Sequence, residues 1–427
     1  MAKLAIRGGE PIRRKPWPQW PIADSKDAQA VANVVLSGQW GRVRREESLA
    51  SEFERRYAEY QGAKYALMIN GGGTQALELS FRALGLGTGD EVILPALGWV
   101  ADVTSLLMSG CIPIFVDVDI DTGNIDPDLI EDAITDQTRA ILPVHTGGRP
   151  CEMDRIIKVA ERNNLFVVED AAHGSGATYR NRGLGTIGDM GGVSLQSSKP
   201  LTCGEGGIVL TNNIELWRTA CELTDPWAGP AWSWFEETVL KREPEGFRRI
   251  SSTRRVTELQ AALALSQLDK LEEWTKRRAE NGEYLDEELS KIDGIKTPRK
   301  DPNITRRSYY YYRFRYLGFD GLSRNRFIDC MKAEGIPCLV GDDVRPLYEL
   351  PILTNPDMGL IKGYPIDKCF YGKTIDYRKV RCPKAERLSR RESVWIFQTA
   401  LLGERSDVDD VVAAIWKIKE NVQEAMN

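Results

Sequence analysis

Residues 165–207 read LFVVEDAAHGSGATYRNRGLGTIGDMGGVSLQSSKPLTCGEGG, and they contain two short apolar runs that each lead to a charged side chain. The first run, Leu165–Val168, is followed at once by an acidic pair that ends in Asp170. The second run, Gly192–Leu195, is followed shortly afterwards by Lys199. Runs of this length between glycines and polar residues predict buried strands. The stretch therefore predicts an acid and a lysine at the ends of two strands.

Further apolar runs of the same kind occur on both sides of this stretch. The complete set is Tyr65–Asn70, Val92–Pro95, Pro113–Val118, Ala140–Val144, Leu165–Asp170, Gly192–Leu195 and Gly207–Thr211. Amphipathic segments that predict helices lie between several of them, namely Gln75–Leu84, Asp126–Ile134 and Glu152–Asn163. Apolar strands separated by helices indicate an α/β fold with a mainly parallel, seven-stranded sheet flanked by helices on both faces. Such sheets bind their ligands at the carboxyl ends of the strands.

The chain length of 427 residues predicts two domains, because a single core rarely grows so large. We expect a large ligand-binding domain over residues 24–270 and a smaller α+β domain over residues 271–427. The long helical pattern of Thr257–Arg278 would bridge them. Residues 1–23, which are rich in proline and tryptophan, predict an extended arm, since proline cannot continue a helix.

The small domain shows both strand and helix patterns. Ser308–Tyr316 predicts a strand, and its aromatic run Tyr309–Tyr312 is interpreted as buried. Arg324–Glu334 and Asp407–Asn421 predict helices.

Composition excludes several classes of function. The net charge of −5 argues against nucleic acid as a partner. The cluster Arg248, Arg249, Arg254 and Arg255 is interpreted as a solvated or interface surface. Eight cysteines without a CxxC pair predict reduced thiols in a cytoplasmic protein, and two histidines make a metal site unexpected. No apolar run predicts a signal peptide or a membrane span.

A lysine and an acid at neighbouring strand ends suit one cofactor, pyridoxal phosphate. Its aldehyde needs a lysine such as Lys199, and its pyridine nitrogen needs an acid such as Asp170. Its phosphate needs a cup, and the turn Asn70–Gln75, with three glycines before a helix, offers free N–H groups. Ser194 could add a hydroxyl to the phosphate, and Trp99 could lie flat on the ring.

The sequence resembles the DegT/DnrJ-type sugar and cyclitol aminotransferases, which are fold-type I pyridoxal-phosphate enzymes. The resemblance covers nearly the whole chain, and its most specific block combines Glu169–His173, Gly188-Asp189, Ser194, Lys199 and Gly204–Gly207. It implies that Lys199 forms the Schiff base and then moves the proton during catalysis. It also implies that Asp170 pairs with the pyridine nitrogen and that His173 lies beside the ring oxygen.

The resemblance assigns the remaining contacts to the cofactor. Trp99 would stack on the ring, and Gly73, Thr74, Gln75 and Ser194 would hold the phosphate.

The family is dimeric, and a loop of the partner chain completes each active site. Here that loop would be Ser251–Glu258, where relatives usually read Gly-x-Asn-x-Arg. Arg255 matches and would contact substrate, whereas Ser251 and Thr253 replace the usual Gly and Asn. The Thr253 hydroxyl could still donate to the cofactor phosphate.

The implied reaction is transamination, because position 199 is Lys and not the His of the related dehydratases. Ser37–Trp40, Leu195–Gly204 and Glu392–Trp395 look closest to the branch that aminates scyllo-inosose or 2-deoxy-scyllo-inosose for aminoglycoside-type products, with L-glutamine as donor. Alternatives are a nucleotide-linked keto sugar as acceptor, an aminohydroxybenzoate synthase-like activity, and a non-catalytic regulatory protein that binds the cofactor.

The sequence contains several other patterns. Gly183–Gly188 matches the GxGxxG dinucleotide fingerprint by letter, but neither a strand precedes it nor a helix follows, so we reject it. Asp117–Asp128 fails as a calcium loop, because Thr122 occupies the position that needs glycine. His145 either borders the pocket or satisfies a strand end. The tryptophans of residues 227–234 suit either a lid or subunit packing.

Overall fold

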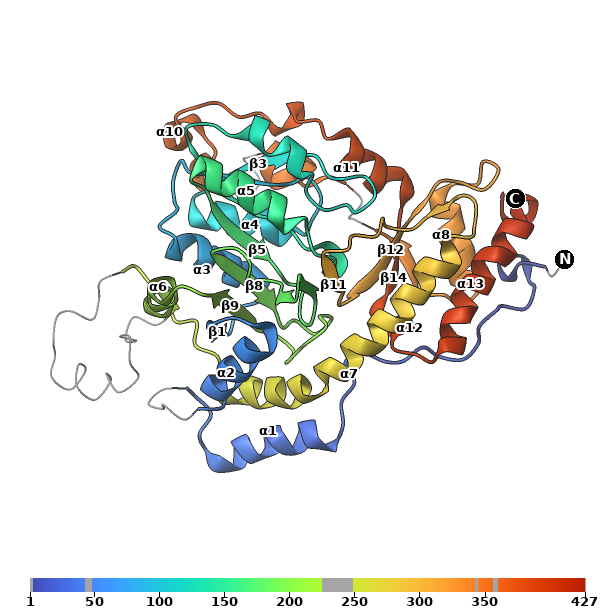
Figure 1. Cartoon of the computed structure of the whole chain (residues 1–427), viewed down its shortest axis with the longest axis horizontal. Helices are drawn as coiled ribbons and strands as arrows, with labels where there is room; N and C mark the ends of the chain where they lie inside the picture. Colours follow the sequence, from blue (N-terminus) through green and yellow to red (C-terminus); the bar gives the residue numbers. More distant parts are fainter. Residues whose placement is uncertain (1–2, 43–47, 225–248, 342–344, 356–359, 427) are drawn as a thin grey trace.

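The computed structural model describes residues 3–42, 48–224, 249–341, 345–355 and 360–426 (Figure 1). Its largest sheet has seven strands in the order β1-β9-β8-β5-β4-β2-β3. The strands are β1 (Tyr65–Ile69), β2 (Glu91–Pro95), β3 (Ile112–Val116), β4 (Thr138–Ile141), β5 (Phe166–Asp170), β8 (Met190–Ser194) and β9 (Gly207–Thr211). All seven predicted runs are confirmed. Only β9 runs antiparallel to its neighbours β1 and β8, so the sheet is mainly parallel.

Helices cover this sheet as the α/β pattern predicts. They include α2 (Leu49–Gln61), α3 (Gly73–Ala83), α4 (Val100–Ser109), α5 (Met153–Asn163) and α6 (Ile214–Thr224). The prediction for Asp126–Ile134 is wrong, since two short 3₁₀ turns, η2 (Pro127–Leu129) and η3 (Glu131–Ala133), replace the helix. The reason is local: only Pro127 and Ile130 of this segment are buried, and these two positions do not form the apolar stripe that a longer helix needs.

One long helix, α7 (Glu258–Leu289), runs beneath both sheets in Figure 1. It begins with a capping box between Thr257 and Gln260, as at many stable helix starts. It extends well past the predicted end at Arg278, because Leu285 and Leu289 continue its apolar face into the second core. The helix α1 (Ser25–Ser37) packs against its first half.

The C-terminal region carries a four-stranded antiparallel sheet in the order β10-β12-β14-β13. Its strands are β10 (Ile295–Lys296), β12 (Tyr311–Tyr316), β13 (Cys338–Val340) and β14 (Ser393–Phe397). The longer helices α8 (Arg324–Ala333) and α13 (Arg405–Glu420) share its core with the short α12 (Gln398–Leu401) and α14 (Val422–Met426). The short helices between β13 and β14, namely α9 (Pro351–Thr354), α10 (Lys368–Tyr371) and α11 (Pro383–Arg387), belong to another core. A three-stranded sheet orders β11 (Ile304–Arg306), β6 (Thr178–Tyr179) and β7 (Arg182–Gly183).

Two features refine the expected domain plan. The strand predicted from Ser308 begins only at Tyr311, because Tyr309 has a left-handed φ of 48° that a strand does not allow. Residues 347–388 share a core with α4 and β2 of the large sheet rather than with the four-stranded sheet. The boundary at residue 270 stays a prediction.

The N-terminal arm lies across the C-terminal region. Buried Arg13 pairs with Asp407 at 2.8 Å, and the Trp17 indole donates to the Gly335 carbonyl at 2.7 Å. Trp20 meets Trp274 of α7 edge to face at 5.1 Å. The arm therefore presents its aromatic side chains to another surface of the same chain, and both termini lie at that end of the molecule in Figure 1. Within the residues described, no helix combines the length and apolar character that a membrane crossing needs.

Candidate active site

The predicted phosphate turn and two strand ends meet at one point of the large sheet. A Cβ placed on Gly73 would lie 3.2 Å from the Ser194 Cβ and 3.7 Å from the Ala172 Cβ. Ser194 ends β8, and Ala172 follows Asp170 at the end of β5. The structure thus brings together the helix start, the hydroxyl and the acid that the sequence assigned to one ligand.

The start of α3 is built to receive an anion. Its N-cap residue, Gly72, has no side chain to cap the first turn. The Gln75 side chain folds back over Gly71, and its Oε1 atom is shielded from solvent without a hydrogen-bond partner in the described chain. The close approach of Gly207 to the Gly71 carbonyl also needs glycine, because a Cβ there would lie 2.5 Å from that oxygen. The free N–H groups of this helix start, next to glycines and a Gln75 side-chain oxygen without a partner among the described residues, fit a phosphate.

Lys199 lies in the loop after β8, partly buried. Its backbone N–H donates to the Gln196 carbonyl at 2.9 Å, which closes a tight turn. Its Nζ lies 4.6 Å from the centre of the Tyr310 ring. Burial lowers the pKa of Lys199, while the nearby Asp170 and Asp102 carboxyl groups oppose that shift. A lowered pKa increases the neutral fraction of the amine, the form that attacks an aldehyde.

Asp170 and His173 lie at the carboxyl end of β5. Asp170 is buried, and its Oδ1 accepts a hydrogen bond from the Ala172 N–H at 2.7 Å. The Nδ1 of His173 accepts from the Gly147 N–H at 3.2 Å, which fixes the neutral tautomer that carries its proton on Nε2. Burial, together with the nearby Lys199, lowers the pKa of His173 well below its usual value. The ring is therefore a neutral donor at physiological pH.

Two further residues reach this site that the sequence did not reveal. The Tyr310 ring stacks on His173 with centroids 4.2 Å apart, and its hydroxyl meets the Ser198 hydroxyl at 2.8 Å. The prediction that Tyr309–Tyr312 forms a buried strand is therefore wrong for Tyr310, which is partly buried, precedes β12 and lies beside Lys199. Asp102, in the first turn of α4, is fully buried, and burial and the neighbouring Asp170 carboxyl raise its pKa well above the usual value. Neither position carries a local sequence signal, because both arrive through tertiary packing.

The other predicted residues are placed as follows. Trp99 is the N-cap residue of α4 and is 60% exposed, so its indole ring is accessible to a flat ligand. Thr253 is exposed. Arg255 is partly buried and forms a strand bridge with Ile69, next to the phosphate turn. Residues 225–248, with Arg248 and the tryptophans at 227, 232 and 234, lie outside the described chain.

The rejected motifs have structural explanations. Glu169 is fully buried and accepts hydrogen bonds from the Gly185, Ile187 and Gly188 N–H groups at 2.9, 2.6 and 2.7 Å, so the GxGxxG-like stretch is a turn wrapped around this carboxylate. His145 is fully buried and lies 2.9 Å from Glu169, which makes it a strand-end partner. In the described chain no group of three potential metal-ligating side chains is found.

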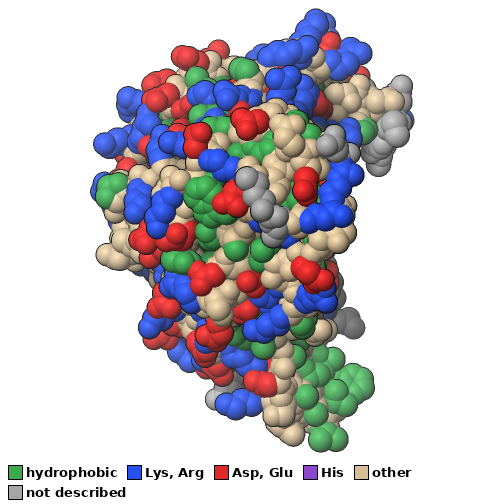
Figure 2. Space-filling view, turned by 90° about the vertical axis from the view of Figure 1, so that its right-hand side faces the viewer, with side chains coloured by type: hydrophobic (Ala, Val, Ile, Leu, Met, Phe, Trp, Pro, Cys, Tyr) green, Lys and Arg blue, Asp and Glu red, His purple; other side chains and the backbone are tan. Residues whose placement is uncertain are grey.

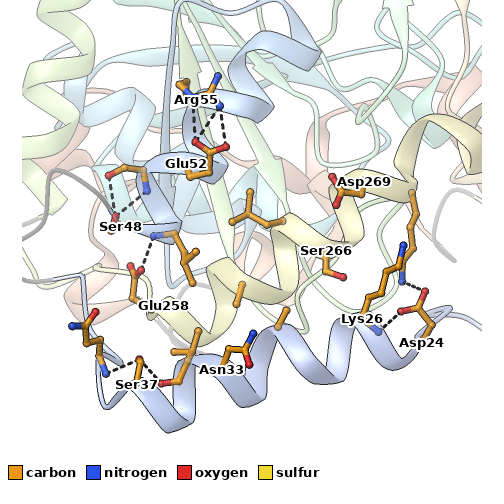
Figure 3. Close-up of a pocket in the computed structure, with 18 of the residues that line it drawn as sticks. Asp24, Lys26, Asn33, Ser37, Ser48, Glu52, Arg55, Glu258, Ser266 and Asp269 are labelled. Carbon is orange, nitrogen blue, oxygen red and sulfur yellow. Dashed lines mark hydrogen bonds and ion pairs between the residues drawn. The ribbon is translucent and has the colours of Figure 1, made fainter.

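A cavity of 1210 Å³ lies away from these residues, between α1, α2 and α7. Figure 3 shows that its labelled side chains come from all three helices, with Asn33 and Ser37 on α1, Glu52 on α2 and Asp269 on α7. Neither Lys199 nor Asp170 lines it. This cavity therefore does not belong to the candidate active site, which is indicated by the convergence of strand ends.

The residues around Lys199 fit pyridoxal phosphate. An uncapped helix start opposite Ser194 suits the phosphate, and the buried carboxylate of Asp170 suits a protonated pyridine nitrogen. Lys199 has the lowered pKa that binding to an aldehyde requires. Each part of the cofactor thus has a complementary group within one site.

Comparison with known proteins gives consistent results. The model of the DegT/DnrJ/EryC1/StrS aminotransferase family matches residues 21–415. A Micromonospora echinospora protein named "Putative L-glutamine:3-amino-2,3-dideoxy-scyllo-inosose aminotransferase" is 36% identical over 98% of both chains. The L-glutamine:2-deoxy-scyllo-inosose aminotransferase of Streptomyces fradiae is 35% identical, again over 98% of both. The crystal structure of 3-amino-5-hydroxybenzoic acid synthase aligns with a TM-score of 0.81 at 27% identity, covering 96% of this chain and 98% of the other.

Proposed function

This chain belongs to the DegT/DnrJ/EryC1/StrS aminotransferase family, and within it we propose that the protein transfers the amino group of L-glutamine to a keto-cyclitol such as scyllo-inosose or 2-deoxy-scyllo-inosose. It is a pyridoxal-phosphate-dependent aminotransferase. The observation that carries the choice of substrates is similarity along nearly the whole chain to enzymes named for L-glutamine and for inosose acceptors. Such an activity would belong to aminoglycoside-type secondary metabolism.

The side chains of the site divide the work of this reaction. Bound pyridoxal phosphate supplies an electron sink for the bond that breaks at Cα. We assign Lys199 to hold the cofactor and then to carry the proton, and its lowered pKa suits both tasks. Asp170 would keep the pyridine nitrogen protonated, and neutral His173 would donate from Nε2 beside the ring oxygen. Trp99 would cover the ring, and Gly73, Thr74, Gln75 and Ser194 would bind the phosphate.

The contacts of the arginine cluster favour the cyclitol over a nucleotide-linked sugar. A sugar nucleotide would need cations for its diphosphate, which Arg248, Arg249 or Arg254 could supply, and Arg248 lies outside the described residues. Arg254 is buried and pairs with Glu78 at 2.8 Å, while Arg249 pairs with Glu222 at 2.8 Å. Both guanidinium groups therefore already have carboxylate partners.

We also propose that the enzyme is a cytoplasmic homodimer whose active sites are shared. All eight cysteines lie in the described chain and none forms a disulfide, which suits a reducing compartment. Leu36 and Trp40, at the end of α1, are 83% and 56% exposed. Figure 2 shows hydrophobic side chains gathered at the lower end of the molecule, the level at which Figure 1 places α1. An exposed apolar region of this kind supports an interface between two copies.

Acceptor choice can be tested in two half-reactions. The cofactor-loaded protein is first treated with L-glutamine, which should abolish the visible absorption band of the lysine-bound cofactor. After removal of the donor, scyllo-inosose, 2-deoxy-scyllo-inosose and a nucleotide-linked 4-keto sugar are offered separately. Return of the band with a cyclitol only supports the proposal, and return with the sugar nucleotide only refutes it. A band that responds to no amino donor would instead indicate a non-catalytic protein.

Sharing of sites is tested by mixing inactive variants. Lys199→Ala should be inactive in its own site, and Arg255→Ala should impair the site that receives its loop. If each site needs both chains, mixing the two variants under exchange conditions restores part of the activity. If each chain instead builds its whole site by itself, the mixture stays as inactive as its components.

A further inference from the structure

Three helices of this protein begin with the same local hydrogen bond. Asp27, Asp102 and Asp407 occupy the third position of α1, α4 and α13, and each uses its Oδ2 to accept the backbone N–H of the residue just before the helix. The distances are 2.8, 2.9 and 2.8 Å. All three residues are buried: the exposed fractions of Asp27, Asp102 and Asp407 are 4%, 0% and 5%. An acid at this position stabilises a helix start whether or not it serves any function.

Two of these aspartates are paired with cations. Burial would raise the pKa of Asp27, but hydrogen bonds from Lys270 and Ser266 outweigh it and hold the pKa at about 2. In the same way Arg13 outweighs burial at Asp407 and holds its pKa at about 2. Both groups are therefore carboxylates at neutral pH.

Asp102 has the opposite surroundings. Its neighbour is a second acid, Asp170, and burial together with this carboxyl raises the pKa of Asp102 well above its usual value. Its Oδ1 atom is shielded from solvent and meets no N–H or hydroxyl donor in the described chain. The charged groups that face Asp102 are Asp170 on β5 and Lys199 after β8. Two neighbouring buried acids repel each other when both are ionised, which favours a proton on one of them.

The proton belongs on Asp102 rather than on Asp170. Each acid accepts one backbone N–H, Asp170 from Ala172 at 2.7 Å and Asp102 from Trp99 at 2.9 Å, but the Oδ1 of Asp102 is buried and has no N–H or hydroxyl donor among the described residues. Asp102 is the more deeply buried of the two, with no exposed surface against 6% for Asp170. We propose that Asp102 stays protonated and donates a hydrogen bond to the carboxylate of Asp170, so that it positions the acid that binds the pyridine nitrogen. This inference rests on the role proposed above for Asp170.

The Asp102 side chain also contacts Trp99, the residue proposed to cover the cofactor ring. Through its bond to the Trp99 N–H, Asp102 fixes the residue whose indole would cover the cofactor. Gly98 makes room for it, since a Cβ there would lie 2.4 Å from the Asp102 Oδ2. A single buried carboxyl thus links the acid at the pyridine nitrogen to the residue proposed to stack on the ring, and Asp102 is a positioning residue rather than a catalytic one.

The first test measures the melting temperature of the cofactor-free protein against pH for the wild type, Asp102→Asn and Asp27→Asn. Asparagine keeps the acceptor for the helix N–H and also supplies a donor toward Asp170. Because the folded pKa of Asp102 is raised, its contribution to stability is complete below the unfolded value of 3.8 and is lost as pH rises toward the folded pKa. Over that pH range, the folding equilibrium constant of the wild type should fall by up to tenfold per pH unit. The Asp102→Asn variant should not show this fall.

The matched variant should behave in the opposite sense. Asp27 is ionised and paired, so Asp27→Asn should melt below wild type throughout pH 5–8. Asp102→Asn should melt increasingly above wild type as pH rises over the same range. If Asp102→Asn instead melts below wild type by the same margin as Asp27→Asn, Asp102 is an ordinary ionised helix-start residue and the proposal is overturned.

The second test measures the dissociation constant of pyridoxal phosphate and the pH dependence of its visible band. Asp102→Asn should bind within about threefold of wild type, because the hydrogen bond to Asp170 is retained. Asp102→Leu should bind at least tenfold more weakly, a loss of one hydrogen bond to a charged group. Equal binding by the Leu variant refutes the positioning role, and if that variant does not fold, the melting comparison above decides. A wild-type protein that binds no cofactor would refute the proposed function itself, a separate outcome.

Discussion

Replacement of Asp170 by asparagine tests the central electrostatic contact of the site. The change keeps the size of the side chain and its acceptor for the Ala172 N–H, which the structure places 2.7 Å away. It removes the negative charge that would hold the pyridine nitrogen protonated. Because Asp170 is only 6% exposed, water has little access to this position and cannot compensate for the lost negative charge.

The expected loss of reaction rate in Asp170→Asn follows from the cost of breaking a buried charge pair, which is about 3–5 kcal/mol when one partner is removed. At about 1.4 kcal/mol per tenfold, the lower end corresponds to a rate loss of about a hundredfold or more. We therefore expect Asp170→Asn to bind the cofactor through Lys199 and to react with L-glutamine at least about a hundredfold more slowly. The measurement is single-turnover decay of the visible band after mixing with L-glutamine.

A matched control comes from Asp189, the residue just before β8, at the other end of the β5–β8 pair. Asp189 also accepts one backbone N–H, from Val167 at 2.8 Å, but it lies at the amino end of β5, away from Lys199. Asp189→Asn should leave the half-reaction unchanged. If Asp170→Asn reacts within threefold of wild type, the assignment of this acid to the pyridine nitrogen is wrong. If both variants are slow, the loss reflects distortion of the strand and not the missing charge.

Three further changes test other contacts. Lys199→Met should abolish the visible band and the reaction with L-glutamine, and a band that persists in this variant would assign the cofactor to another lysine. Lys417→Met should destabilise the fold by about 3–5 kcal/mol in urea unfolding, because it leaves fully buried Glu334 without its cation at 2.8 Å; a loss below 1 kcal/mol would contradict a buried pair. Burial would raise the pKa of Glu169, but His145 and the Gly185 and Gly188 N–H groups lower it, so its stabilising contribution is present above pH 4.5 and lost as pH falls through the folded pKa. Glu169→Gln should therefore melt below wild type at pH 7, and the gap should close on acidification; a gap independent of pH would show that the charge is not involved.

The large sheet could be predicted because its signal is strong and local. Strands buried on both faces are continuously apolar, and each of the seven runs became a strand within a few residues of its predicted ends. The site followed from the same logic, since Asp170 and Ser194 end neighbouring parallel strands and Gly73 opens the helix opposite them. The chemistry of Lys199 then narrowed the ligand to one cofactor.

What could not be predicted depends on contacts between distant segments. Tyr310 reaches Lys199 from the C-terminal region, and its own sequence context predicted only a strand. Asp102 reads locally as a good first-turn acid, the same as Asp27. Only the neighbour across the fold, an acid in one case and a lysine in the other, separates them. Periodicity and motif spacing contain no information about that neighbour.

The adjacent acids Glu169 and Asp170 show how one strand divides structural and functional work. Successive residues of a strand point to opposite sides, so only one of the pair can face the cofactor site. Glu169 points into the core, where its carboxylate binds the turn that leads into β8. That bond holds β8 against β5 in the register that places Asp170 opposite Gly192, two residues before Ser194. The structural acid thereby sets the distance between the functional acid and the strand that leads to Lys199, which is why replacing either residue should affect the same reaction by different physical routes.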